Sequence, residues 1–432
     1  MLSSGDVVEL VDTLGLEPSA ARRGGSTPSI PTIYSFVCYR TNYNSFEIII
    51  MQKTINTFSN NNFLNDQDAI DRIFTHIDNG TTDLGSEVWK EPVENYHTQE
   101  RFDLEIALLR RLPIPFCPSA ALIENGSYIA RRASGTPLLV VRGEDGKVRA
   151  FINACRHRGM KVANGNGCKK KAFVCPYHAW SYALDGSLKN IPGENGFPNL
   201  DNKDNGLVEV NATEKGGLVY VQQEGVIDSN FINNSLDCLG PNAVLFDQSE
   251  VTDETNWKLL TETLLEGYHI KSLHKKTFYP YGLNNINVVE TDGPNSRIIF
   301  PFKRIEKIRD IESKKRKLNG VATSVYHLFP NASISVLSKH TSLTIMEPLS
   351  PSSVKTVSYL VYNDEGGAKS LSLEEVKKDA LFVNESGQSE DREAARAIQE
   401  TVTTTANTHL TFGLFEKAIV NFHKSLASRI NN

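Results

Sequence analysis

Two short motifs in this chain each pair a cysteine with a histidine. Cys155 and His157 form a Cys-x-His motif, Cys175 and His178 form a Cys-x-x-His motif, and residues 158–174 separate the two. Thiolate sulfur and imidazole nitrogen are strong ligands for transition metals, and four of them can hold a zinc ion or a two-iron cluster. The chemistry that these residues predict is metal binding.

The order of the ligands separates the two kinds of metal site. Zinc fingers usually place two cysteines in one half of the site and two histidines in the other. Here each half supplies one of each, which suits a [2Fe–2S] cluster with thiolates on one iron and imidazoles on the other. We therefore expect an electron-transfer cluster, with a structural zinc ion as the alternative.

A second group of possible ligands lies further along the chain. Glu262, Glu266 and His269 fall at i, i+4 and i+7, which is one face of a helix, and His274 follows five residues later. A helix predicted over residues 257–274 must end or widen between the two histidines if both bind one metal. Two histidines and one carboxylate form the facial triad of non-haem Fe(II) oxygenases, which leaves positions open for dioxygen.

The cysteine–histidine motifs resemble the cluster loops of the Rieske non-haem iron ring-hydroxylating oxygenases. The resemblance rests on Cys-Arg-His-Arg-Gly at 155–159 and Cys-Pro-Tyr-His-Ala-Trp at 175–180. Ala179 departs from the glycine that many members carry. Respiratory Rieske proteins have a further cysteine in each loop, and Met160 and Tyr177 at these positions favour the oxygenase branch.

The resemblance also implies which residues hold the mononuclear iron. His269 and His274 match the family's two histidine ligands, and its third ligand is an acidic residue far downstream. Asp391 is the expected third ligand, because the pair Glu390-Asp391 followed by Gln399 is similar to the family's Glu-Asp…Gln signature. The rival carboxylates are Glu385 and Glu390.

Glu266 matches the family's bridging acid, although many members carry aspartate there. The resemblance implies that Glu266 hydrogen-bonds a cluster histidine of the neighbouring subunit, here His178, and so links the cluster to the iron. Such a path between subunits implies a homotrimer. The sequence has no GxGxxG fingerprint, so the electrons are expected from a separate NAD(P)H-dependent reductase or ferredoxin.

Hydrophobic periodicity predicts an α+β protein in which an all-β module is inserted near the start of a second domain. The resemblance implies that this module is the Rieske domain and that the second domain is a helix-grip-like catalytic domain. That catalytic domain is expected to combine an antiparallel sheet with C-terminal helices. The predicted divisions are N-terminal helices at 51–112, the Rieske domain at 113–224 and the iron-binding catalytic domain at 225–432. Residues 1–50 are expected to be disordered or not native, with Met51 as the natural start.

The composition excludes several classes of protein. With 46 basic and 51 acidic residues the net charge is −5, which argues against nucleic acid as the main partner. No stretch approaches the roughly 18 apolar residues that a membrane helix needs. The chain has 6 cysteines, too few for a disulfide scaffold, and we expect a cytoplasmic protein.

The leading functional hypothesis is hydroxylation of an aromatic or other small organic substrate with dioxygen, by a mono- or dioxygenase. A choline- or carnitine-like monooxygenase or demethylase of quaternary amines is the alternative within the same family. A Rieske electron-transfer protein without a working second iron is the non-enzyme alternative, and iron content distinguishes it. Among the other histidines, His327 lies in a strand region that could line the pocket.

Overall fold

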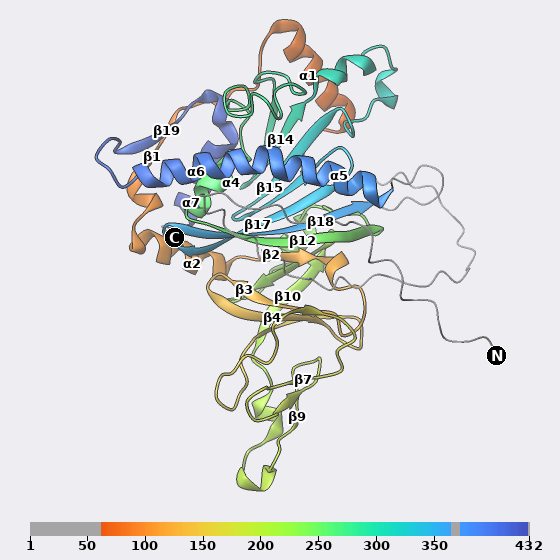
Figure 1. Cartoon of the computed structure of the whole chain (residues 1–432), viewed down its shortest axis with the longest axis vertical. Helices are drawn as coiled ribbons and strands as arrows, with labels where there is room; N and C mark the ends of the chain where they lie inside the picture. The colour runs from red at the N-terminus through yellow and green to blue at the C-terminus, as the bar shows by residue number, and fades with distance from the viewer. Residues whose placement is uncertain (1–61, 364–371, 431–432) are drawn as a thin grey trace, which may run out of the picture. The chain divides into compact units, whose positions relative to one another are not determined.

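The computed structural model of this protein describes residues 62–363 and 372–430. The expected disordered or non-native leader at residues 1–50 lies outside this range. The elements follow the predicted order of helix, β module, helix, sheet and helices, and the α+β fold class is confirmed (Figure 1). None of the helices in the described ranges is long and apolar enough to cross a membrane.

The first β module contains two antiparallel sheets. Its hairpins turn at Gly146 and Gly186, whose φ angles of 76° and 85° lie in the left-handed region that glycine adopts without strain. The larger sheet contains, in spatial order, β2 (Ile114–Pro118), β11 (Leu218–Gln222), β10 (Glu209–Lys215), β5 (Val148–Ile152), β4 (Thr136–Arg142), β3 (Tyr128–Ala133) and β6 (Gly165–Gly167). The smaller sheet contains β7 (Phe173–Val174), β8 (Ser181–Tyr182) and β9 (Leu188–Asn190).

A second antiparallel sheet of seven strands forms the centre of the C-terminal half. Its strands are, in spatial order, β12 (Ala243–Asp253), β18 (Ser353–Asn363), β17 (Thr341–Ser350), β16 (Ala332–Val336), β15 (Ala322–Leu328), β14 (Asn295–Pro301) and β13 (Val288–Asp292). Successive side chains of a strand point to opposite faces. Leu343 and Ile345 of β17 therefore join a core shared with the first module, whereas Met346 joins the core formed with the helices.

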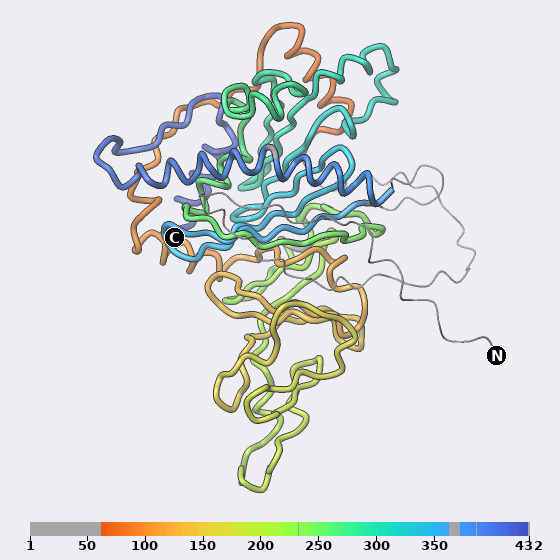
Figure 2. The backbone as a smooth tube through the Cα atoms, viewed as in Figure 1, coloured from red at the N-terminus to blue at the C-terminus, as the bar shows by residue number. Residues whose placement is uncertain are grey.

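Residues of α2, α4, α6 and α7 form the core on the second face of this sheet, and the long α5–α6 segment crosses that face (Figure 2). α5 begins with a capping box in which Ser372 and Glu375 each accept the other's backbone N–H. One π-helical turn, Asn384–Gln388, joins α5 to α6. The helices are α1 (Asp66–Asn79), α2 (Gln99–Arg111), α3 (Ser229–Asn234), α4 (Trp257–Thr263), α5 (Leu373–Val383), α6 (Ser389–Thr401) and α7 (Lys417–Ile430).

One predicted helix was too long, and the C-terminal helical stretch contains a break. The helix expected over residues 257–274 ends at Thr263, and the chain continues in irregular turns. The sequence also predicts helix from Glu390 to Ile430, with a break as an option, and the structure has this break, where β19 (His409–Phe412) separates α6 from α7. This strand pairs with β1 (Trp89–Pro92), so its backbone groups are satisfied by a segment distant in sequence. Tertiary contacts therefore override the local helical pattern.

A buried ion pair fixes α4 against α2. The ammonium group of Lys258 is fully buried and lies 2.7 and 3.0 Å from the two carboxylate oxygens of Glu105. The same carboxylate accepts hydrogen bonds from Trp257 Nε1 at 2.7 Å and Arg101 Nε at 2.8 Å. Glu105 thus forms ion pairs with both Lys258 and Arg101, and removing Lys258 takes away the partner that is fully buried.

We expect the substitution Lys258→Met to lower the free energy of unfolding by about 3 kcal/mol, because Glu105 keeps its buried charge and loses its ammonium partner. Lys355→Met is the matched control, since Lys355 and Glu250 also lie 2.7 Å apart but have side chains 35% and 41% exposed. The control should cost less than about 1 kcal/mol. Urea denaturation followed by circular dichroism measures both, and equal losses would contradict the role assigned to the buried pair.

Candidate functional site

Each predicted cluster cysteine begins a tight loop, and the same backbone hydrogen bonds form within each of the two loops. The Cys155 N–H donates to the carbonyl of Met160 and the Cys175 N–H to that of Trp180, both at 2.8 Å. The first loop follows β5 and the second follows β7, so each is anchored at the end of a strand. The two loops therefore have the same backbone hydrogen-bond pattern, although the histidine is the third residue of the first loop and the fourth of the second.

The fifth residue of each loop adopts a left-handed conformation. Gly159 has a φ angle of 76° and Ala179 one of 59°, and their N–H groups donate to the carbonyls of Cys155 and Cys175 at 2.9 Å. Glycine adopts this conformation freely, whereas alanine pays about 1 kcal/mol for it. The departure noted at Ala179 is therefore a small cost in free energy and leaves the loop geometry intact.

The loops aim two imidazoles at one point beside two thiols. His157 Nδ1 lies 3.1 Å from His178 Nδ1, and Cys155 and Cys175 are buried free thiols. The His157 ring stacks on Trp180 with centroids 5.0 Å apart and planes at 10°, which fixes its orientation. Two thiols and two convergent imidazoles are the donor set that a Rieske [2Fe–2S] cluster requires.

Tyr182, in β8, contacts the first cluster loop, and the sequence motifs do not include it. Its hydroxyl accepts the Arg156 N–H at 2.9 Å and lies 3.2 Å from the Cys155 sulfur. Burial, followed by the hydrogen bond with Cys155, raises the pKa of Tyr182, so the hydroxyl keeps its proton. Hydrogen bonds to cluster sulfurs tune the reduction potential. The only sequence signal was a tyrosine two residues after the second loop, in β8.

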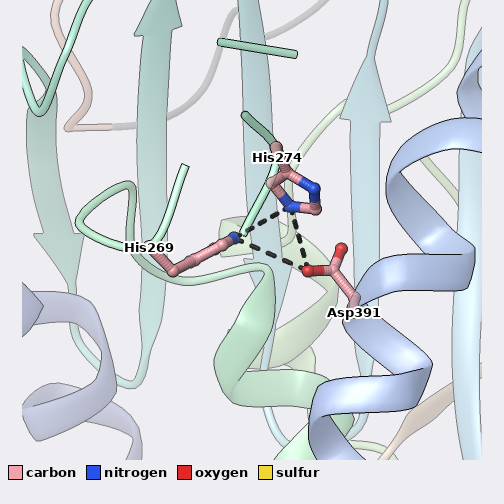
Figure 3. A group of neighbouring side chains, drawn as sticks. All are labelled: His269, His274 and Asp391. Carbon is pink, nitrogen blue, oxygen red and sulfur yellow. Dashed lines mark hydrogen bonds and ion pairs between the residues drawn. The ribbon is translucent and has the colours of Figure 1, made fainter. Parts of the chain in front are cut away.

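The second set of predicted ligands converges between the end of α4 and the start of α6 (Figure 3). The ligand atoms of His269, His274 and Asp391 all lie within 4.8 Å of one another. His269 Nε2 is 3.1 Å from His274 Nε2, and Asp391 Oδ1 is 3.5 Å from the first and 3.1 Å from the second. In the described part of the chain, these three are the one group of His, Cys, Asp or Glu ligand atoms close enough together to hold a single ion.

The other nitrogen of each histidine is held by a different carboxylate. His269 Nδ1 bonds Glu266 Oε1, and His274 Nδ1 lies 2.8 Å from Glu390 Oε2, which also accepts the Thr277 hydroxyl at 2.6 Å. These contacts place the protons on Nδ1 and leave both Nε2 lone pairs facing the centre. Glu390, a rival third ligand in the sequence, therefore orients His274 instead.

The electrostatics of this group fit a divalent cation. Asp391 Oδ1 is buried and accepts no hydrogen bond, and two Nε2 lone pairs face it. Burial lowers the pKa of His274, but the carboxylates of Asp391 and Glu390 outweigh burial and raise it. Without a cation at the centre, a proton on His274 would have to balance the negative charge of these carboxylates. Two imidazoles and one carboxylate are the ligand set of non-haem Fe(II).

The expectation that Glu262 shares a helix face with Glu266 and His269 was wrong. Because α4 ends at Thr263, Glu262 points away from the triad. Its Oε1 accepts the Tyr96 hydroxyl at 2.8 Å and lies 2.9 Å from His423 Nε2. Glu262 therefore belongs to a buried network that joins α4 to α7.

Two other candidates also lie outside the site. Glu385, a rival third ligand, is exposed in the π-helical turn. His327 does not line the cavity as suggested, because it is fully buried, with its ring 5.3 Å from that of Phe422. Burial lowers the pKa of His327 to about 3, so it stays neutral in the core.

A cavity of about 380 Å³ lies beside the triad, between the sheet and the α5–α6 segment. The Phe278 ring borders it and packs on His274 with centroids 5.0 Å apart. Gly387, in the π-helical turn, lets this ring approach, since an added Cβ would overlap it. Neither residue was singled out in the sequence, where the available signal was a glycine within a helical pattern.

Gln399 connects α6, which carries Asp391, to the start of α4, which precedes the two histidines. Its Oε1 accepts the backbone N–H of Asn256 at 2.7 Å, just before α4 begins. Because Gln399 and Asp391 share α6, this bond sets the position of Asp391 relative to the segment that follows α4. The residue of the Glu-Asp…Gln signature thus has a positioning role and lies outside the triad.

Two family models match this chain. The Rieske [2Fe–2S] domain matches residues 113–201, and the ring hydroxylating alpha subunit (catalytic domain) matches residues 243–432. The glycine betaine monooxygenase oxygenase subunit of Chromohalobacter salexigens is 35% identical over 40% of this chain and 39% of its own length. The chloroplastic choline monooxygenase of Spinacia oleracea is 27% identical over 69% of each chain. The carnitine monooxygenase oxygenase subunit of Escherichia coli is 31% identical over 44% of this chain and 53% of its own length.

Solved structures with the same fold extend the similarity over more of the chain. A quaternary ammonium Rieske monooxygenase in complex with L-carnitine has a TM-score of 0.66 and 17% identity, covering 86% of this chain and all of that one. Naphthalene 1,2-dioxygenase with phenanthrene has a TM-score of 0.64 and 16% identity, covering 79% of this chain and 92% of that one. With a Rieske domain followed by a ring-hydroxylating catalytic domain on this common fold, the chain belongs to the Rieske non-haem iron oxygenases, as predicted.

Proposed function

We propose that this chain is the oxygenase component of a monooxygenase that oxidises a quaternary ammonium compound. The proposal rests on one observation, a group of aromatic rings in the cavity beside His274. The similarity to glycine betaine, choline and carnitine monooxygenases supports it. Within the expected range of small organic substrates, the quaternary-amine alternative is the one that these observations favour.

Three aromatic rings form one wall of the cavity. The centroid of the Phe382 ring is 6.3 Å from that of Phe278 and 5.8 Å from that of Tyr281, with interplanar angles of 66° and 89°. Rings at steep angles present several π faces to one volume, which is how proteins bind quaternary ammonium groups. We define Phe278, Tyr281 and Phe382 as the aromatic wall.

An acidic side chain adds negative potential to the same cavity. Asp379 lies on α5 one turn before Phe382 and also lines the cavity. It is 2.9 Å from His340 Nδ1 and its side chain is 20% exposed, so the carboxylate is oriented and still faces the cavity. An aromatic wall together with a carboxylate is the environment that a cation-binding site needs.

The metal assignments are part of the proposal. Cys155, His157, Cys175 and His178 would hold the [2Fe–2S] cluster, and His269, His274 and Asp391 would hold the iron. When bound, the two centres supply electron delivery and dioxygen activation. Converting a substrate C–H bond to C–OH with one oxygen atom releases the other as water and consumes two electrons and two protons. The electrons would come from a separate NAD(P)H-dependent reductase or ferredoxin.

A second copy of the chain is needed to connect the two centres. In the described residues of one chain, the His178 ring is exposed and its contacts are with His157 and Tyr177 of the cluster loops. Glu266, the proposed bridging acid, instead contacts His269. We propose a homotrimer in which His178 of one subunit approaches Glu266 of the next.

We expect the purified protein to contain about three irons per chain and His269→Ala to contain about two, because only the mononuclear site loses a ligand. The EPR signal of the reduced cluster should remain, while substrate oxidation is lost. Metal analysis and EPR of both proteins measure this. His97→Ala, which changes a histidine outside both sites, is the control. Zinc in place of iron in the wild-type protein would refute the assignment.

Phe382→Leu should weaken the binding of a quaternary ammonium substrate about tenfold, because it removes the aromatic ring that contacts both other rings of the aromatic wall. Binding of an uncharged tert-butyl isostere of the same shape should change little. Phe415→Leu, at a ring that is 39% exposed and outside the cavity, is the matched control. Calorimetry on the iron-loaded protein measures these affinities, and an equal loss for cation and isostere would argue against cation recognition.

Gly387→Ala should raise KM at least about tenfold without loss of iron, since the new methyl group pushes the Phe278 ring into the cavity. Backbone propensity alone favours alanine in a helical segment by roughly 0.5–1 kcal/mol, so the helix itself should persist. Gly196→Ala, where an added Cβ meets no atom within 4 Å, is the control. Steady-state kinetics with iron quantitation test this, and unchanged kinetics would show that the wall does not contact substrate.

A further inference from the structure

A guanidinium group is held in place at the rim of the cavity. Arg304 belongs to the 3-10 helix Lys303–Ile308, just after β14. Its Nε donates to the carbonyl of Gly320 and its Nη2 donates to the Ser338 hydroxyl at 2.8 Å. The guanidinium carbon also lies 4.6 Å from the centroid of the Phe302 ring. These contacts, two of them to other segments of the chain, leave this exposed side chain little freedom, so its charge is preorganised.

The charge of Arg304 is not neutralised by the protein. Arg304 forms no ion pair with any of the described residues. Among the described residues that line the cavity, it is the one lysine or arginine. Three other arginines of the same domain, Arg297, Arg309 and Arg316, each lie within 3 Å of a carboxylate. The Nε and Nη2 of Arg304 donate to Gly320 and Ser338, whereas its Nη1 has no hydrogen bond within the described residues and can donate to a carboxylate from solution.

Arg304 and the metal triad lie at different positions along the cavity. Ser335 of β16 borders the cavity with Asp391, whereas Ser338, the partner of Arg304, is three residues further along in the turn before β17. At about 3.3 Å per residue the two serines are up to about 10 Å apart. The cavity therefore offers an aromatic wall for a cation next to His274 and a guanidinium for an anion at its rim.

We propose that the substrate is a zwitterion, with a quaternary ammonium group at one end and a carboxylate at the other. This rests on the proposed function and adds a second recognition element to the same cavity. Arg304 binds the carboxylate, and the aromatic wall holds the ammonium group so that the carbons bonded to nitrogen face the triad. Choline, which carries a hydroxyl in place of the carboxylate, gains nothing from Arg304 and binds less tightly.

The test compares three ligands of the iron-loaded protein by anaerobic calorimetry. They are γ-butyrobetaine, choline, and the uncharged alcohol in which a tert-butyl group replaces the trimethylammonium group of choline. We expect the wild-type protein to bind γ-butyrobetaine at least about tenfold more tightly than choline, since a hydrogen bond between charged groups is worth this much. Arg304→Gln should remove that difference by weakening γ-butyrobetaine alone. Lys307→Gln, the same change of charge on the same 3-10 helix but outside the cavity lining, should leave it unchanged.

The outcomes separate this inference from the proposed function. If choline binds the wild-type protein as tightly as γ-butyrobetaine, or if Arg304→Gln weakens both ligands equally, the carboxylate assignment is wrong and the quaternary ammonium function stands. If the uncharged alcohol binds as well as either cation, the proposed function itself is wrong. Arg304→Lys provides a further check, because a lysine that restores part of the affinity for γ-butyrobetaine identifies charge as the cause.

Discussion

The placement of two imidazole lone pairs and one buried carboxylate oxygen around a common point constrains the rest of the catalytic half. His269 Nε2 and His274 Nε2 are 3.1 Å apart, and Asp391 Oδ1 is near both without a hydrogen bond. Such an arrangement is unfavourable unless a cation occupies the centre. The protein holds it by fixing the opposite nitrogen of each ring with the carboxylates of Glu266 and Glu390.

This constraint accounts for the irregular backbone on both sides of the triad. A continuous helix through residues 257–274 would direct the two histidines to different faces, so α4 ends at Thr263 and the chain turns. On the other side, the π-helical turn Asn384–Gln388 lies immediately before α6 and changes the direction in which Asp391 points. The same turn contains Gly387, which leaves room for Phe278 and so shapes the cavity.

Rigid elements around the triad keep this geometry. The central sheet turns one face to the first β module and the other to the helices and the cavity, because alternate residues of strands such as β17 differ in direction. Lys258 and Glu105 hold the start of α4 to α2, and Gln399 holds it to α6. Precise placement of ligands depends on such supporting contacts, which lie outside the metal site.

The sequence by itself determined the cofactor chemistry and the fold class. Metal coordination admits few residue types, so residue type and spacing were enough to propose six ligands, Cys155, His157, Cys175, His178, His269 and His274. Strand and helix periodicity predicted an α+β protein with a β module in the first half. Asp391 was predicted only because Glu390-Asp391 followed by Gln399 resembles the family's Glu-Asp…Gln signature. No local rule connects Asp391 to histidines more than a hundred residues earlier.

Only the tertiary structure decided how these residues are used. It assigned Glu390 to His274, turned Glu262 toward Tyr96 and His423, placed His327 in the core, and brought Tyr182 to the Cys155 sulfur. It also assembled the aromatic wall and Arg304 around one cavity from segments that are distant in sequence. The physical reason is that periodicity and spacing describe neighbours along the chain, whereas the direction of a side chain depends on contacts between distant segments.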